Sequence, residues 1–156
     1  LLGMISGNHE DRAMKDSGVD ITKNICSILG VPYLGYTSFI DFHIGKIRYT
    51  AFATHGSSSS TILAGKINSV TKLSQHRDAD LFLHGHVHDI WAGSDVVLRV
   101  NRHTKTVEEQ KRYYVLTGAY LKYHGSYGEQ KGYPPSKTGT PRIRFNGVKK
   151  DIHISI

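Results

Sequence analysis

Four apolar runs in this chain are each followed at once by a short polar motif. The motifs are Gly7-Asn8-His9-Glu10, Thr54-His55-Gly56, Gly85-His86-Val87-His88 and Thr117-Gly118. Short apolar runs that end in turn residues are typical of buried β-strands. The loops that follow strands are where α/β sheets place their ligands. The sequence therefore predicts that these four motifs lie at strand ends.

Two helices are expected between the early strands. The segment 19–32 has Asp20 at the N-cap position, and Gly30 and then Pro32 end it. A second helix is expected at about 61–76, capped by one of the serines 57–60. The apolar face of that helix is expected to contain Leu63, Ile67, Val70 and Leu73. Lys66 and Lys72 are expected to face outward.

The other segments predict strands, hairpins and one long loop. Strands are expected at 1–5, 79–84, 90–100 and 111–121, with a polar loop around 101–109. Hairpins are expected at 36–55, turning at Gly45-Lys46, and at 141–156, turning at Asn146-Gly147. Residues 122–141 are rich in Gly, Pro, Tyr and Lys and predict an ordered loop or lid. Because helices separate the early strands, the fold class is α/β and layered.

Charge and composition restrict the partners. Lysine and arginine number 20 against 13 acidic residues, a net charge of +7, which favours a phosphate-bearing partner, nucleic acid or a smaller anion. No apolar run approaches the ~18–20 residues of a membrane-spanning helix, and no signal peptide opens the chain. The single cysteine, Cys26, cannot form an intrachain disulfide. We therefore expect a cytoplasmic protein with no membrane partner.

The beginning of the chain suggests a missing neighbour. It opens "LLGMI" without an initiator methionine, and this run predicts a strand buried on both faces. Such a strand needs other strands beside it and elements that cover it. We therefore expect residues 1–156 to form a single domain that is N-terminally incomplete, the C-terminal portion of a larger one.

The histidines in these motifs suit a metal centre. Imidazole nitrogens are ligands for Zn, Mn, Fe or Co, and Asn8 would add a neutral oxygen. His86 and His88 are two residues apart, so they would share a face on an extended strand, and on a loop they could enclose one site. Each residue also has a simpler interpretation: a loop histidine for His9, His86 and His88, a turn residue for Asn8, a helix-start acid for Glu10 and an unpartnered strand end for His55.

Gly-Asn-His-Glu, then a histidine, then Gly-His-x-His, in this order, resembles the calcineurin-like metallophosphoesterases over residues 7–118. The resemblance implies a β-sandwich flanked by helices, with two divalent metals (Mn, Zn, Fe or Ni) at the strand ends. It implies that Asn8, His55 and His86 bind the second metal and His88 the first. His9 would be the catalytic histidine and Glu10 the acid that orients it, with a metal-bridging hydroxide as nucleophile. The tyrosine-rich segment after residue 118 resembles phage or prophage phosphoesterases.

Two motifs of that family are absent from this chain, Asp-x-His and Gly-Asp-x-x-Asp or Glu. They supply most ligands of the first metal and the bridging carboxylate. Asp41–His43 and Asp151–His153 spell Asp-x-His, but each falls within an expected strand and has no Gly-Asp partner. We therefore expect this chain alone to hold one metal and to be weakly active or inactive.

The resemblance predicts an enzyme that hydrolyses phosphoester bonds, a phosphodiesterase or nuclease. The basic charge favours a nucleic-acid substrate over a small phosphomonoester, and a protein phosphatase would share the same site. Tyrosines and lysines of 120–133 would either stack on nucleic acid or pack within the lid. His84 and Asp89 are expected to support ligands. The alternative is a non-catalytic basic module that binds nucleic acid or mediates assembly. A third interpretation is a structural site in which histidines hold one metal. Closed zinc sites, however, do not use an open loop with an Asn ligand.

Overall fold

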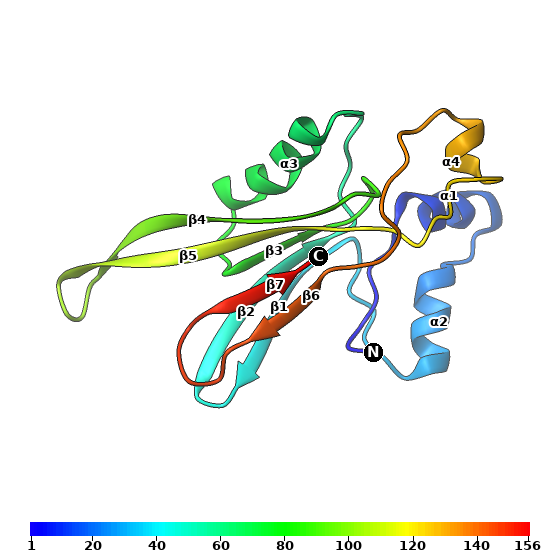
Figure 1. Ribbon diagram of the computed structural model, residues 1–156. Helices are drawn as coiled ribbons and strands as arrows, with labels where there is room; N and C mark the ends of the chain where they lie inside the picture. Colours follow the sequence, from blue (N-terminus) through cyan, green and yellow to red (C-terminus); the bar gives the residue numbers. More distant parts are fainter.

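A mixed sheet of five strands, in the order β1-β2-β3-β5-β4, forms the centre of the computed structural model, which describes residues 1–156. β2, β3 and β5 are parallel to one another, and β1 and β4 are antiparallel additions at the two edges (Figure 1). A second sheet contains only β6 and β7. The strands are β1 (Thr37–Ile44), β2 (Ile47–Thr54), β3 (Leu81–His84), β4 (Ile90–Asn101), β5 (Thr106–Thr117), β6 (Arg142–Phe145) and β7 (Ile152–Ser155).

Four α-helices and one 3-10 turn connect the strands. They are α1 (Asn8–Ser17), α2 (Ile21–Leu29), α3 (Leu63–Thr71), the 3-10 turn η1 (Lys72–Gln75) and α4 (Tyr127–Gln130). The mixture of sheet and helices confirms the predicted α/β class. No helix of the chain is long and apolar enough to cross a membrane.

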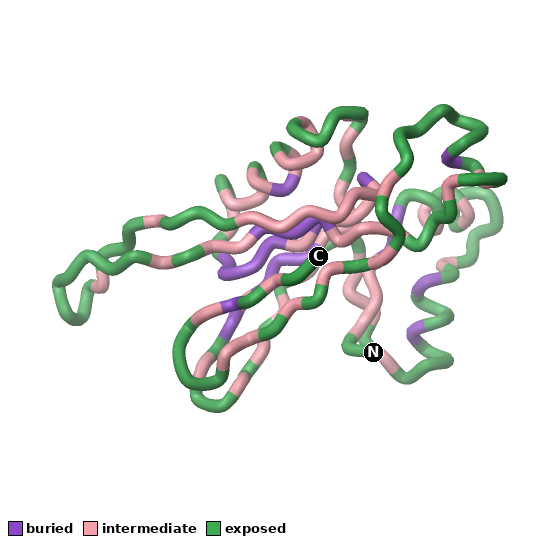
Figure 2. Tube along the Cα trace, in the orientation of Figure 1, coloured by how far each residue is buried: buried purple, intermediate pink, exposed green.

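The central sheet is covered on both faces. On one face Val70 of α3 packs with Phe52, Phe82, Tyr114 and Leu116. On the other, Ile152 of β7 packs with the remaining central side chains, Tyr49, Ala51, Leu81 and Val115. The buried residues accordingly concentrate on the middle strands (Figure 2). A helix, a five-stranded sheet and a two-stranded sheet thus form three layers.

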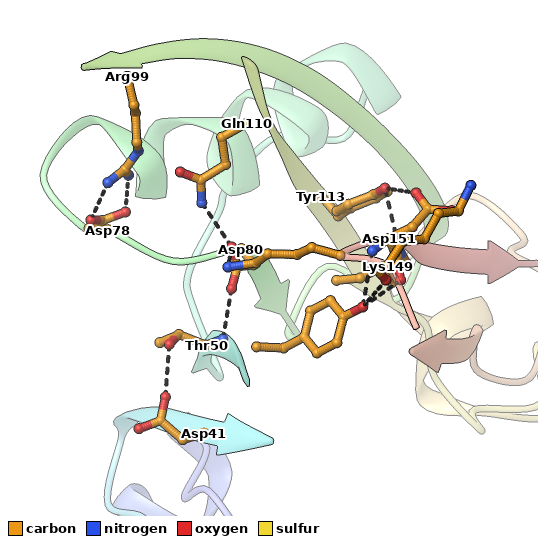
Figure 3. Close-up of polar contacts among 12 residues, drawn as sticks. Asp41, Thr50, Asp78, Asp80, Arg99, Gln110, Tyr113, Lys149 and Asp151 are labelled. Atoms are coloured by element: carbon orange, nitrogen blue, oxygen red, sulfur yellow. Dashed lines mark hydrogen bonds and ion pairs between the residues drawn. The ribbon is translucent and has the colours of Figure 1, made fainter. Parts of the chain in front are cut away.

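Polar contacts fix the β6–β7 hairpin on the sheet (Figure 3). The buried Tyr49 hydroxyl lies 2.7 Å from the Asn146 carbonyl oxygen and accepts from the Asp151 amide at 3.0 Å. Tyr113 donates its hydroxyl proton to the Asp151 carboxylate at 2.8 Å. Asp151 is therefore engaged in holding the hairpin.

The other Asp-x-His sequence is also part of the sheet. Asp41 on β1 accepts from the Arg48 guanidinium at 2.6 Å and from the Thr50 hydroxyl at 2.8 Å. The neighbouring His43 is exposed on the same strand. Asp41 and His43 therefore lie on β1, and Asp151 ends the β6–β7 loop while His153 lies on β7, so both Asp-x-His sequences have structural surroundings apart from the loops that follow β2 and β3.

The local predictions for α2 and the first hairpin are confirmed. The Asp20 carboxylate accepts from the Lys23 amide at 2.9 Å, and Gly30 ends α2 in the left-handed conformation, with φ of 65°. β1 and β2 pair without interruption from Thr37–Thr54 to Ile44–Ile47, around the Gly45-Lys46 turn. These elements depend only on neighbouring residues.

Several boundaries were predicted wrongly. Residues 1–5 form no strand: Leu1 and Leu2 are exposed, and only Met4 makes an isolated bridge, to Tyr33. No serine caps α3, because the Ser60 hydroxyl donates to the Ile62 carbonyl instead.

The two turns after the helical region also differ from expectation. β5 already begins at Thr106, because β4 and β5 pair as far as Asn101–Thr106 and leave only a four-residue turn at 102–105. The last hairpin has a six-residue loop, 146–151, in place of a two-residue turn. Backbone groups of that loop hydrogen-bond to the Tyr49 hydroxyl. Within the loop, the Asn146 side chain accepts from the amides of Val148 and Lys149.

Candidate metal centre

The candidate site lies where parallel strands β2 and β3 end. Thr54 and His84 are paired neighbours at these ends, so the residues after them, His55 and the Gly85–His88 loop, leave the sheet side by side. α1 begins at Asn8 beside them. Three of the four sequence motifs therefore meet at one end of the sheet. The fourth, Thr117-Gly118, supports the loop after β3: the Thr117 hydroxyl donates to the His84 carbonyl at 3.4 Å and the Gly118 amide to the Asp89 carbonyl at 3.0 Å.

Three predicted ligands meet at one point. The Nε2 atom of His55 lies 2.8 Å from Oδ1 of Asn8 and 3.2 Å from Nδ1 of His86. The two imidazole rings meet edge to face, with centroids 5.1 Å apart. These residues come from α1, the β2 end and the β3 end, which are far apart in sequence.

The spacing of these atoms fits one metal ion. Tetrahedral ligands with bonds of about 2.1 Å are about 3.4 Å from one another. The distances from His55 Nε2 to Asn8 Oδ1 and to His86 Nδ1 are shorter, as expected where a proton on His55 Nε2 is shared between the two acceptors. A cation in place of that proton requires an outward shift of only a few tenths of an ångström. Asn8, His55 and His86 therefore fit one divalent metal.

The loop that carries the histidines has an unusual backbone. His86 and His88 both adopt the left-handed conformation, with φ of 67° and 59°. This conformation costs a non-glycine residue roughly 1–2 kcal/mol, and such strain is often found at functional sites. Val87 between them is buried in the core on the α3 face of the sheet. The buried valine anchors the loop and helps to offset the strain.

His84 supports the site from within the sheet. Its ring is buried, and Nδ1 donates to the Gly85 carbonyl at 2.7 Å. Nε2 then faces Gly56, where an added Cβ would lie only 2.3 Å away. Gly56 also has φ of 75°, so this position needs glycine for both space and conformation. His84 is packed, as the sequence predicted, and holds the loop after β2.

The start of α1 places Asn8 against His55. Gly7 is the N-cap, and its amide donates to the Glu10 carboxylate at 3.1 Å. A Cβ on Gly7 would lie 2.7 Å from Glu10 Oε2 and 2.8 Å from His55 Cε1, so only glycine allows this approach. Glu10 therefore occupies the helix-start position that the sequence left open, and its predicted role in orienting His9 stays a prediction.

A cavity of about 330 Å³ opens beside the three ligands. His9 and His88 line it together with Asn8, His55 and His86, so all five predicted side chains other than Glu10 face the same space. No Asp or Glu lines it. Nowhere in the chain do three or more His, Cys, Asp or Glu side chains gather closely enough to hold a metal, and the trio at this site includes an amide.

Two basic residues of the cavity were missed from the sequence. Lys66 was expected to face outward, but its side chain is only 11% exposed and its ammonium group lies 2.5 Å from the Asp89 carboxylate. The reason is that α3 turns this face toward the loop after β3. Arg12 also lines the cavity, one helical turn after His9, a spacing that could have identified it.

The segment 122–141 covers the far side of the cavity. Its ends are joined where the Gly139 amide donates to the Ala119 carbonyl at 2.8 Å. Tyr123, Tyr127 and Tyr133 line the cavity opposite the histidines. The rings of Tyr127 and Tyr133 also contact each other edge to face at 5.9 Å. The lid both packs on itself and forms a wall of the site.

Burial lowers the pKa of two imidazoles of the site, those of His55 and His88. It lowers the pKa of His55 below its ordinary value of 6.5, and the charge that protonated His86 would carry lowers it further. Burial also lowers the pKa of His88, again with a contribution from His86. Neutral imidazole is the form that binds a metal. The lowered pKa values of His55 and His88 therefore favour the form of imidazole that can act as a ligand.

Comparisons with protein-family models, with curated proteins and with solved structures gave no match for this chain. The resemblance to calcineurin-like phosphoesterases accordingly depends on the order and placement of the motifs themselves.

Proposed function

We propose that this chain carries the histidine side of a calcineurin-like metallophosphoesterase centre and acts in the metal-dependent hydrolysis of phosphoester bonds. The observation that supports this best is the meeting of Asn8, His55 and His86 within 2.8–3.2 Å, from three separate motifs. A random set of loop histidines has no reason to meet an asparagine amide in this way.

Each cavity residue has a proposed task. A divalent metal held by Asn8, His55 and His86 would supply Lewis acidity toward a phosphoryl oxygen. His9, which faces the same cavity, would donate a proton to the leaving oxygen. Arg12 and Lys66 would hold the phosphate charge in place. His88 would be the ligand that this chain offers to a first metal.

One side of a two-metal centre lacks protein ligands here. No carboxylate lines the cavity, so the bridging ligand of two metals is not among its side chains. We therefore propose that the chain by itself holds one metal and turns over phosphoesters weakly or not at all.

The lid favours a substrate with an unpaired base. Three tyrosines opposite the histidines give planar surfaces on which a base can stack, and the chain has a net charge of +7. A nucleic-acid phosphodiester satisfies both features, and the reducing cytoplasm is the compartment we propose for it. A small alkyl phosphate would leave the tyrosine wall without a contact.

A second function is supported by the charge of the same cavity. Arg12 and the ring nitrogens of the histidines line it and no acid does, so it could bind a phosphate with no metal at all. A non-catalytic nucleic-acid-binding module would use it in this way. Its binding would weaken steeply with salt and would not change with added metal.

Metal titration of the 156-residue chain by calorimetry separates the two functions. We expect one Mn²⁺ or Zn²⁺ per chain, lost in His55→Ala and in His86→Ala. His43→Ala is the matched control, because His43 is exposed on β1 and far from the cavity motifs. Hydrolysis of bis(p-nitrophenyl) phosphate with added Mn²⁺ measures turnover in parallel. Failure of the wild-type chain to bind either ion would reject the metal centre and favour the binding module.

A further inference from the structure

The hairpin of β4 and β5 forms an arm that extends beyond the rest of the central sheet (Figure 1). The outer part of the arm is mostly exposed (Figure 2). β4 is the last strand in the sheet order, so one of its edges has no neighbour. Along that edge, backbone N–H and C=O groups of alternate residues lack strand partners. This open edge extends over the 12 residues of β4.

The edge carries two charged side chains, Asp95 and Arg99, but lacks three other common protections against pairing. Isolated edge strands commonly carry a lysine, a proline or a bulge. β4 has no lysine or proline, and it pairs with β5 without interruption from Ile90 to Asn101. One face instead presents Val96, Leu98 and Val100, of which Leu98 is 71% exposed and Val100 68%. An apolar edge of this kind gains stability when it is covered.

The two charges on β4 are arranged symmetrically about Val97. Asp95 and Arg99 flank three apolar residues and share the face opposite to Leu98. When the same segment is read in the opposite direction, the acid takes the place of the base. The segment is therefore complementary in charge to an antiparallel copy of itself.

We propose that β4 pairs antiparallel with β4 of a second copy of this chain, centred on Val97. Asp95 then lies opposite the partner's Arg99, and Val96 lies opposite the partner's Leu98. A two-fold axis forms each contact twice, which is the usual symmetry of homodimers. The two five-stranded sheets join into one continuous sheet.

Other registers do not satisfy the charges. Opposite residues of an antiparallel pair lie on the same face, so the centre can shift only by whole residues. Centring on Val96 or Leu98 leaves Asp95 and Arg99 without each other. Centring on Asp95 or on Arg99 places like charges face to face, which is destabilising.

Existing ion pairs would extend across the proposed interface. Asp95 accepts from Arg112 at 3.0 and 2.6 Å. Arg99 donates to Asp78 at 2.7 Å (Figure 3). In the Val97-centred register, the order becomes Arg112, Asp95, the partner's Arg99 and the partner's Asp78. The signs alternate, so each inner charge lies between two opposite charges.

Cysteine cross-linking tests both the pairing and its register. Val97→Cys places two thiols at the two-fold axis, where opposite Cβ atoms are about 4.5–5.5 Å apart, near the disulfide range. Val100→Cys is the matched control, because that residue faces the partner's Ser94 and cannot meet itself. We expect mild oxidation to give a disulfide-linked dimer for Val97→Cys and none for Val100→Cys. The native Cys26 is buried and stays out of the reaction.

Sedimentation of the unmodified chain gives a second readout. We expect a monomer–dimer equilibrium in the wild type and loss of the dimer in Leu98→Lys, which places lysines opposite Val96 of the other copy. A wild-type chain that is monomeric at every soluble concentration would overturn the proposal. Cross-linking of Val100→Cys as fast as Val97→Cys would overturn the register. Neither result depends on metal binding or on hydrolysis.

Discussion

The Nε2 atom of His55 lies 3.2 Å from the Nδ1 atom of His86, although 31 residues separate them in the chain. Two imidazole nitrogens at this distance can share one proton, and a second proton would place two positive charges side by side. Protonation of both rings is therefore unfavourable. The two histidines follow the ends of two paired parallel strands, so the pairing of these strands determines the distance between the rings.

Acid is expected to destabilise the chain through its histidines. Burial lowers the pKa of His55, His84 and His88 below 6.5 in the folded state, so the unfolded chain binds more protons in this range. Stability should therefore be fully present above pH 6.5 and should fall as the pH falls from there through the lowered values. Urea unfolding on both sides of pH 6.5 measures this, and His84→Gln should make the decline shallower. A midpoint independent of pH in this range would contradict it.

Gly7→Ala should damage the metal centre more than its size suggests. The added methyl group would lie 2.8 Å from His55 Cε1, and because the ring must move, we expect about tenfold weaker metal binding or worse. Overpacking of this kind costs about 1–3 kcal/mol of stability.

Gly18→Ala is the control for that substitution. Gly18 ends the same helix in a left-handed conformation, with φ of 73°, and no atom lies near its Cβ position. Gly18→Ala should lose about 1 kcal/mol of stability from backbone strain. Its metal affinity should equal that of the wild type. Equal metal affinity in Gly7→Ala and Gly18→Ala, measured by calorimetry, would show that His55 does not depend on this contact.

The Lys66–Asp89 pair should contribute more than a surface ion pair. Lys66 is mostly buried, and its loss in Lys66→Met leaves Asp89 without its cation, which we expect to cost about 1–3 kcal/mol. A double-mutant cycle with Asp89→Asn measures the coupling by urea unfolding. The exposed Lys15–Asp11 pair on α1 serves as the reference and should couple by less than about 1 kcal/mol. Similar coupling in both pairs would mean that burial adds nothing here.

The tyrosine wall predicts a difference between two tyrosines of the same segment. Tyr127 lines the cavity, so Tyr127→Ala should weaken binding of a single-stranded oligonucleotide about tenfold, within the ~1–3 kcal/mol of one stacked base. Tyr120 is 77% exposed and does not line the cavity, so Tyr120→Ala should bind as the wild type does. Fluorescence anisotropy measures both. Equal losses of affinity in the two variants would mean that the tyrosines that line the cavity contribute no more than an exposed surface tyrosine does.

Local signals accounted for much of the fold. Asp20 and Gly30 sufficed for α2, and alternation around Gly45-Lys46 sufficed for the first hairpin, because each depends on nearby residues. The apolar start failed as a strand because pairing needs a partner, and only Met4 found one. The Asn146 turn failed because the hydroxyl of Tyr49, about 100 residues earlier, shapes that loop.

The candidate site followed from motif order more than from local patterns. The resemblance implied that Asn8, His55 and His86 act together, and the structure brings them together. The parallel ends of β2 and β3 account for the two histidines but not for Asn8, which no strand precedes. Lys66 was placed on the wrong side because its partner, Asp89, lies on another segment. The left-handed backbone of His86 and His88 has no signature in residue type alone.

Val87 fastens the histidine loop into the same cluster of side chains that holds α3 against the sheet. The loop that carries His86 and His88 is therefore attached to the core, and heating should not displace these two histidines while the core remains intact. Release of a bound ion and loss of sheet structure should therefore coincide in one thermal transition. A substitution that loosens the packing around Val87 should lower the affinity for the ion before it unfolds the sheet.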